Sequence, residues 1–407
     1  MSSLPVKSRK PRKTSPLRPV GTTLMMLLLG GCSAPAPVIR PDEAQVKQFA
    51  GRGYQSDDHY GVSTTFVSWE LNGPDESCEF ALTLPARSGP LPVVLYLPGL
   101  GENRAAGESW RTAWASTGYA VLSIQPLTQD SQAWGSAKAL AGDFAGLARD
   151  RYAGKAMAAR VAALRQCLGE ARRRQGKGEA PFDRLDLSKV AVAGYDLGAY
   201  TAMVLAGEPV RQAQVPALPV EVAAVIALSP HADFSGLPLS ERYQQIQTPV
   251  LSITSPADTD PLNLVGSPSL RKAPFEYMPA GDKYLLSLGQ VSHRLLAGGK
   301  AEEVTDTSRN GAAPVAGGNP PSGQGSRSGR GGRGGKGAAD AAPEAAPGAA
   351  SPASQLLLTQ QAQAVAAVQS VSTAFLDAVF RQDGIAREWL AQDAKRWLRG
   401  VGELQRK

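Results

Sequence analysis

Six short apolar runs, separated by segments with helical periodicity, constrain the fold of this chain more than any other feature. Uninterrupted apolar runs of this length are typical of strands covered on both faces, and their alternation with helices predicts a parallel sheet. We therefore expect an α/β fold with a mostly parallel, doubly wound sheet flanked by helices and no large cap domain. The runs span residues 91–98, 119–124, 189–194, 222–229, 249–255 and 283–289.

The remaining elements are predicted from local patterns. Two β-rich stretches within 61–83, separated by Asn-Gly-Pro-Asp, predict a hairpin ahead of the first run. Apolar residues at three- and four-residue steps predict helices, the last of which should pack back on the sheet. The expected helices span 105–117, 136–175, 197–207 and 354–400.

The N-terminus has the pattern of an export signal. Residues 1–31 contain six basic residues and no acidic one, and an apolar stretch at 20–29 is too short to span a bilayer. Leu29-Gly-Gly-Cys32 resembles the lipobox of bacterial lipoproteins. That resemblance implies that Cys32 becomes the lipid-modified N-terminus, and Ser33 after it implies a periplasm-facing outer-membrane anchor.

Charge and composition limit the classes of partner that we expect for this chain. The net charge of +7 falls to about neutral without the six signal-peptide cations, because 37 basic residues then face 36 acidic ones. We therefore expect no nucleic-acid partner. The expected partners are a small-molecule substrate or ligand, and a membrane through the lipid anchor. We expect no cofactor and no metal, and the oligomeric state is left open.

The expected organisation is one ordered domain with two appendages. A signal peptide at 1–31 precedes a Pro- and Ala-rich tether at 32–60. The core at 61–300 is interrupted by a Gly-, Ser-, Arg- and Pro-rich insertion at 301–353, too poor in apolar residues to order itself. A C-terminal helix at 354–407 completes the same domain. Within the exported part, Cys78 and Cys167 either pair or pack as small apolar residues.

Gly194-Tyr195-Asp196-Leu197-Gly198 is the strongest chemical signal. It lies between a predicted strand and a predicted helix, where a G-x-nucleophile-x-G sequence lifts its central side chain to the edge of the sheet. The two glycines are needed because the turn is strained and its neighbours crowd it. Asp196 is therefore the candidate nucleophile.

Two more residues follow in the order expected of a catalytic triad. Asp258 lies just after the run 249–255, with Asp260 as a rival, and His293 lies after the run 283–289. The other two histidines, His59 and His231, are expected to be structural or solvent-facing.

Backbone amides near the elbow are candidates for polarising a substrate. The amide of Leu197 follows the nucleophile, and that of Leu100 lies in the glycine-containing loop 98–103 after the first apolar run. Gly99 and Tyr195 complete the expected substrate-binding set.

These segments resemble the dienelactone-hydrolase and platelet-activating-factor-acetylhydrolase-like branch of α/β-hydrolases. The likeness is carried by LYLPGLGENRAAG, VAVAGYDLGAYTAMVLAG, PVLSITSPADTDP and STAFLDAVFRQDGIAREWL. It covers about 61–300 and 360–400 and implies hydrolysis of esters or lactones by a Ser-His-Asp triad. The chain departs from the pattern at the decisive atom, because Asp196 replaces the nucleophilic serine, Tyr195 replaces the elbow histidine, and Pro98 replaces a loop histidine.

An aspartate at this position leaves three interpretations open. The main one is a divergent hydrolase of ester- or lactone-type ancestry with an Asp-His-Asp constellation. In a second, two carboxylates favour a protonated His293, and the protein is an inactive ligand-binding or envelope-scaffold lipoprotein. In a third, Asp196 attacks carbon–halogen or epoxide bonds, since a carboxylate is a competent nucleophile at saturated carbon. Leu197 instead of Trp, and only about 18 residues for a cap after the run 222–229, count against the third.

The anchor assignment predicts a processed, lipid-bearing N-terminus at Cys32. Inhibition of lipoprotein signal peptidase in the expressing cell should leave residues 1–31 attached, because that enzyme cuts only before the modified cysteine. Intact-mass spectrometry of the membrane fraction measures this. A mass that does not change under inhibition would remove the anchor.

Overall fold

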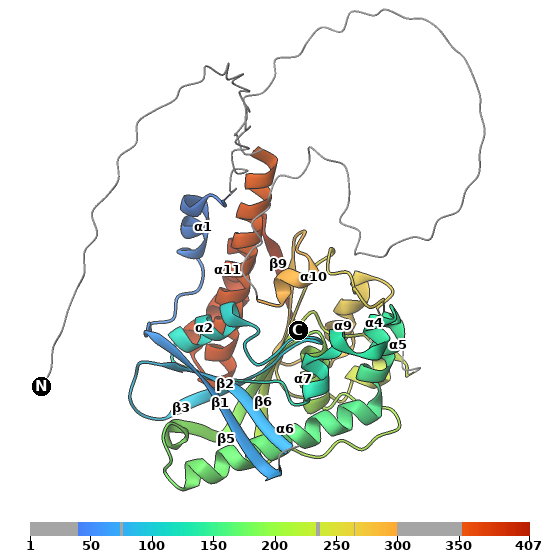
Figure 1. The fold of residues 1–407 in the computed structure, drawn as a ribbon. Helices are drawn as coiled ribbons and strands as arrows, with labels where there is room; N and C mark the ends of the chain where they lie inside the picture. The colour runs from blue at the N-terminus through green and yellow to red at the C-terminus, as the bar shows by residue number, and fades with distance from the viewer. Residues whose placement is uncertain (1–39, 74–75, 233–236, 264, 299–351) are drawn as a thin grey trace, which may run out of the picture. The chain divides into compact units, whose positions relative to one another are not determined.

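The computed structural model describes residues 40–73, 76–232, 237–263, 265–298 and 352–407 (Figure 1). The expected signal peptide, Cys32 and the insertion at 301–353 lie outside these residues, apart from Pro352 and Ala353 at its end. In the described part, nine strands form one sheet, in the order β1-β2-β4-β3-β5-β6-β7-β8-β9. The strands are β1 Val62–Gly73, β2 Glu76–Pro85, β3 Leu91–Leu97, β4 Ala120–Ile124, β5 Leu185–Tyr195, β6 Glu221–Leu228, β7 Val250–Thr254, β8 Lys283–Leu288 and β9 Gly402–Arg406.

The middle of the sheet is parallel, as the uninterrupted apolar runs predict. Strands β4, β3, β5, β6, β7 and β8 pair in parallel, whereas β1, β2 and β9 pair antiparallel at the two sides. β3 is flanked by β4 and β5, so the winding direction reverses there. At such a switch point the loops after neighbouring strands separate and leave a crevice at their carboxyl ends. The expected α/β class with a mostly parallel sheet is confirmed.

Helices cover both faces of the sheet (Figure 1). One face packs against α2 and α11, with Trp110, Trp114 and Phe375 in its core, and the other packs against α6 and α7. The helices are α1 Glu43–Ala50, α2 Glu108–Ser116, α3 Thr128–Ser131, α4 Ala137–Leu140, α5 Phe144–Tyr152, α6 Gly154–Gly176, α7 Leu197–Leu205, α8 Leu239–Tyr243, α9 Ala273–Tyr277, α10 His293–Leu296, α11 Pro352–Phe380, α12 Gly384–Gln392 and α13 Ala394–Trp397.

The single helix expected at 136–175 is wrong. The segment forms α4, α5 and α6, with two sharp breaks. Gly142 adopts a positive φ of 76° after α4, and the side chain of Asp143 then caps α5 by accepting a hydrogen bond from the Gly146 amide. Ala153 is extended (ψ 149°) and separates α5 from α6. Helical periodicity does not reveal these breaks, because apolar residues continue at helix-like spacing on both sides of them.

The expected tether at 32–60 is also too long. Residues from Asp42 onward belong to the folded domain: Phe49 of α1 stacks on Trp397 with ring centroids 4.5 Å apart. The Tyr54 hydroxyl donates to Asp377 Oδ2 at 2.9 Å, inside the domain. Composition did not reveal this boundary, because Phe49 and Tyr54 find their partners on the C-terminal helices, far along the chain.

The C-terminal region packs back on the sheet as expected, but it is not one helix through 407. Gln382, with a φ of 61°, ends the run after α11, and the chain closes with β9 paired antiparallel to β8. Among the described residues, α11 alone is long and apolar enough to cross a bilayer; 78% of its apolar window is buried inside the domain, as in a core helix.

Cys78 of β2 and Cys167 of α6 form a disulfide, which links the antiparallel side of the sheet to α6. The pairing resolves the alternative that the sequence left open. Because the bond closes a separation of 89 residues, its loss enlarges the conformational freedom of the unfolded chain.

Replacing Cys167 by serine should therefore lower the free energy of unfolding by about 2–4 kcal/mol. Urea denaturation of the oxidised wild type and of the variant measures this. The same loss should appear when wild type is reduced, and equal stability of oxidised and reduced wild type would contradict the prediction.

Candidate active site

The candidate site lies where the carboxyl ends of β3, β5, β7 and β8 meet. Asp196 occupies the turn between β5 and α7 with a φ of 48° and a ψ of −107°, a combination that L-residues rarely adopt. The turn is pressed against its neighbours: a Cβ at Gly198 would lie 1.9 Å from the carbonyl oxygen of Leu97, and one at Gly194 would lie 2.3 Å from Gly198. The glycines at 194 and 198 are thus required by close backbone contact.

The carboxylate of Asp196 is held by one hydrogen bond and faces one imidazole. The Tyr152 hydroxyl, at the end of α5, donates to Oδ2 at 2.6 Å, and Oδ1 lies 4.0 Å from His293 Nε2. The side chain also sits at the N-terminus of α7, where the helix dipole favours negative charge. One oxygen is therefore fixed and the other is directed to the histidine.

His293 and Asp258 are brought together as predicted. His293 Nδ1 lies 2.7 Å from Asp258 Oδ1, which also accepts a hydrogen bond from Ser229 Oγ at 2.7 Å. Thr254 Oγ1 donates to the other carboxylate oxygen at 2.8 Å. The rival, Asp260, accepts hydrogen bonds from the Leu262 and Val265 amides in its own turn. Asp258 is therefore the residue that orients His293.

The environment of Asp258 keeps it ionised. Burial by itself would raise the pKa of Asp258, but the hydrogen bond with His293 and the positive charge of Arg271 outweigh it and lower the pKa. Arg271 is fully buried, with Nε 3.3 Å from Asp258 Oδ1. The negative charge of Asp258 beside Nδ1 favours the tautomer with its proton on Nδ1. Nε2, which faces Asp196, is then free to accept a proton.

Glu102, in the loop 98–103, is a third carboxyl group at the site, and no role was predicted for it. Its Oε2 accepts a hydrogen bond from the Gly99 amide at 2.8 Å. Burial raises the pKa of Glu102 to about 7; the Gly99 hydrogen bond and His293 act to lower it, and the charge of Asp196 raises it further. Gly99, expected to belong to the substrate-binding set, donates its amide hydrogen bond to this carboxyl.

The other predicted binding residues have different positions. Tyr195 packs its ring 5.0 Å from the imidazole of His293, and its hydroxyl donates to the His293 carbonyl at 3.1 Å, so it positions the histidine. Leu100 lines the site cavity, and Leu197 begins α7 directly after Asp196. The expectation that the amides of Leu100 and Leu197 polarise a substrate remains a prediction.

A cavity of about 550 Å³ opens onto these groups. Asp196, His293 and Glu102 line it, and most of the remaining wall is apolar. Trp134, from the short helical segments before α5, lies against Gly101 on one side of the cavity; a Cβ at Gly101 would overlap its indole. The other lining residues are Leu100, Tyr195, Thr259, Pro261, Leu262, Ser292, Arg294 and Ala297.

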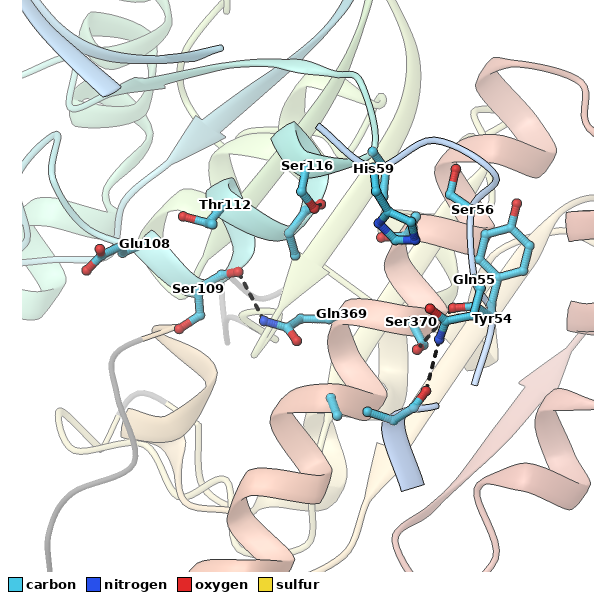
Figure 2. A pocket seen from close by; sticks show the side chains of 15 residues that line it. Tyr54, Gln55, Ser56, His59, Glu108, Ser109, Thr112, Ser116, Gln369 and Ser370 are labelled. Carbon is cyan, nitrogen blue, oxygen red and sulfur yellow. Dashed lines mark hydrogen bonds between the residues drawn. The ribbon is translucent and has the colours of Figure 1, made fainter. Parts of the chain in front are cut away.

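The remaining histidines lie outside this arrangement. His231 is buried with its ring centroid 4.5 Å from that of Tyr152, so it supports the residue that holds Asp196. His59 lines a second cavity of about 500 Å³ between the segment after α1, α2 and α11 (Figure 2). That cavity is lined mostly by hydroxyl and amide side chains, including Ser109, Thr112 and Gln369, and Figure 2 shows no grouping of nucleophile, base and acid in it.

Tyr152 and Ser229 are site residues that sequence reasoning missed. Tyr152 lies in a region expected to be the middle of a helix, and nothing in its local sequence marks it. Ser229 ends a predicted strand, and its side chain is fully buried. Its hydroxyl lies 2.8 Å from His293 Nδ1, on the side of the ring away from Asp196, so it does not replace the missing serine nucleophile. In the described part of the chain, no group of three or more His, Cys, Asp or Glu residues is arranged to hold a metal ion.

Searches against protein-family models and against curated proteins found no match to this chain.

The raised pKa of Glu102 predicts a pH-dependent stability. The folded state keeps this carboxyl protonated up to about pH 7, whereas the unfolded chain releases the proton near its ordinary pKa of 4.5. The contribution of Glu102 to stability is therefore complete below that value and is lost as the pH rises to 7. Glu102→Gln should accordingly gain stability relative to wild type between pH 5 and pH 8, as measured by urea unfolding.

The matched control is Glu108→Gln, at an exposed position of α2. A difference between Glu102→Gln and wild type that stays constant with pH, measured beside this control, would contradict the prediction.

Proposed function

We propose that this protein is a hydrolase of the α/β-hydrolase fold in which the Asp196 carboxylate attacks a saturated carbon that carries a leaving group. The observation that carries the proposal is the placement of Asp196 in a strained turn that opens to a cavity, with His293 Nε2 4.0 Å from one carboxylate oxygen. The strand order, with parallel strands between antiparallel outer strands, supports the fold assignment.

A carboxylate changes which reaction the site favours. Attack on an ordinary ester would require a carboxylate to expel an alkoxide and form a mixed anhydride, which is strongly uphill. Displacement at saturated carbon forms an alkyl ester of Asp196 instead, and covalent chemistry of this kind is open to aspartate nucleophiles. An ester- or lactone-cleaving ancestry therefore accounts for the scaffold, and the present nucleophile favours a different bond.

The second half of the reaction uses His293. Its Nε2 takes a proton from water, which adds to the carbonyl carbon of the Asp196 ester, while Asp258 stabilises the imidazolium that forms. Tyr152 has the geometry to assist, because the oxygen to which its hydroxyl donates becomes the carbonyl oxygen of the ester. That oxygen gains negative charge on water addition, so the Tyr152 hydrogen bond strengthens when it is needed.

The cavity indicates a small and largely apolar substrate. Leu100, Trp134 and Leu262 line the cavity, and its volume of about 550 Å³ suits a molecule of roughly drug size or smaller. The disulfide is consistent with an exported protein, because such bonds form in oxidising compartments. Together with the export signal and the lipobox-like Leu29-Gly-Gly-Cys32 of the sequence, it supports our proposal that the enzyme is held in the cell envelope by a lipid anchor at Cys32.

One observation favours a second candidate, a ligand-binding lipoprotein without turnover. The carboxylate of Asp196 already accepts a short hydrogen bond from Tyr152 and faces His293, so the cluster is internally satisfied. A site of this kind stabilises the fold as it stands. The two candidates differ in one respect: only the hydrolase forms a covalent ester at Asp196.

The ester can be trapped by removing the water-activating base. His293→Gln, incubated with 1-bromohexane, should gain the mass of one hexyl group, because attack needs no base whereas ester hydrolysis does. Intact-mass spectrometry detects the adduct and peptide mapping locates it on Asp196.

The control is the double variant His293→Gln with Asp196→Asn, which should stay unmodified, since asparagine has the same shape and no nucleophilic charge. Absence of the adduct from His293→Gln would favour the binding protein.

A further inference from the structure

We infer that the Glu102 carboxyl group donates a proton to the leaving oxygen of the substrate, and that the substrate class is therefore an epoxide. This inference rests on the proposed function of Asp196. It begins from the position of a carboxyl group on the same cavity as the nucleophile, contributed by the loop between β3 and α2.

The loop that presents Glu102 is held in place. Gln125, after β4, donates from Nε2 to the Glu102 carbonyl at 2.9 Å and to the Gly99 carbonyl at 3.2 Å. The Gly99 amide donates to Oε2 of the Glu102 carboxyl, so the hydrogen bond is made to one oxygen. The side chain lines the cavity with its carboxyl group anchored at a defined place.

The groups around Glu102 favour its neutral form. Burial disfavours its charged form most, and Asp196 repels its negative charge in addition. The buried phenols of Tyr96 and Tyr195 lie near it from β3 and β5. The Gly99 hydrogen bond and the charge of His293 act in the opposite direction, and Arg294 lines the same cavity from α10. Arg104, a cation of the same loop, is paired with Glu79 on β2. A carboxyl group in these surroundings retains its proton near neutral pH, as its raised pKa indicates.

A neutral acid is required for one type of leaving group and not for another. Halide departs as a stable anion, whereas the oxygen of an epoxide departs as an alkoxide and benefits from a proton delivered as the carbon–oxygen bond breaks. An acid beside the nucleophile is therefore a feature of carbon–oxygen cleavage. The three-membered ring keeps that oxygen close to the attacked carbon, within one cavity.

The proton balance closes over one cycle. Asp196 Oδ1 forms a bond to an epoxide carbon, the carbon–oxygen bond breaks, and the oxygen takes the Glu102 proton to become a hydroxyl. Water, deprotonated by His293, adds to the ester carbonyl; the tetrahedral intermediate then expels the alkoxide, which takes the proton from His293. Asp196 is left as a carboxylic acid and passes its proton to the Glu102 carboxylate. The sum is epoxide plus water giving a vicinal diol.

The test measures hydrolysis of 1,2-epoxyhexane against pH by wild type, Glu102→Gln and Glu108→Gln. In wild type the turnover rate should fall as the pH rises through about 7, where Glu102 loses its proton. Glu102→Gln should be slower by about 10²-fold or more at pH 6, and its rate should lose the fall near pH 7. The matched control, at an exposed position, should retain the wild-type rate and profile.

The outcomes separate this inference from the proposed function. If His293→Gln is alkylated at Asp196 by 1-bromohexane but wild type does not open the epoxide, Asp196 is a nucleophile and the role of Glu102 is overturned. Epoxide turnover with an unchanged rate in Glu102→Gln overturns it as well. If His293→Gln gains no hexyl group and wild type does not hydrolyse the epoxide, both proposals are overturned.

Discussion

The site depends on the close contact between the backbone of the Asp196 turn and the end of β3. The carbonyl of Leu97 occupies the space where a side chain at 198 would begin, so the chain can pass only with glycine there. A non-glycine residue at positive φ costs on the order of 1–3 kcal/mol and persists where surrounding contacts overdetermine it. Here the Asp196 amide donates to the Leu228 carbonyl at 3.0 Å, and the Asp196 carbonyl accepts from the Tyr200 amide at 2.9 Å. These bonds hold the turn from the neighbouring strand and from the helix that follows.

The chemistry of the site follows from the two oxygens of the Asp196 carboxylate, where a serine would have one. A serine presents a single hydroxyl that must lose its proton to react, whereas a carboxylate can attack without first giving a proton to a base. Tyr152 fixes one oxygen, and the other remains on the side of His293. The histidine, supported by Asp258 and Ser229, is then available for activating water. Asp258 has the buried cation Arg271 beside it and a lowered pKa, whereas burial raises the pKa of Glu102, so these two carboxyl groups are suited to different tasks.

Much of the fold follows from local patterns. The six apolar runs predict the parallel strands β3 to β8, because strands buried on both faces have no polar alternation. The order of Asp196, Asp258 and His293 predicts the central cluster, since loops after parallel strands meet at one edge of the sheet. The breaks at Gly142 and Ala153 escaped prediction, as did the packing of Phe49 and Tyr54 on the C-terminal helices. Each of these depends on partners distant in the sequence, which periodicity does not register.

The amino-acid sequence by itself determined the class of fold, the position of the strained turn and the identity of the residue placed there. It did so because strand burial, helix periodicity and glycine requirements are local properties of the chain. Only the tertiary structure decided which groups surround Asp196. Tyr152 reaches it from a helix 44 residues earlier, Glu102 faces it from the loop after β3, and Cys78 pairs with Cys167. The physical reason is that the charge, hydrogen bonding and burial of a side chain depend on neighbours in space, and folding brings those together from separate parts of the chain.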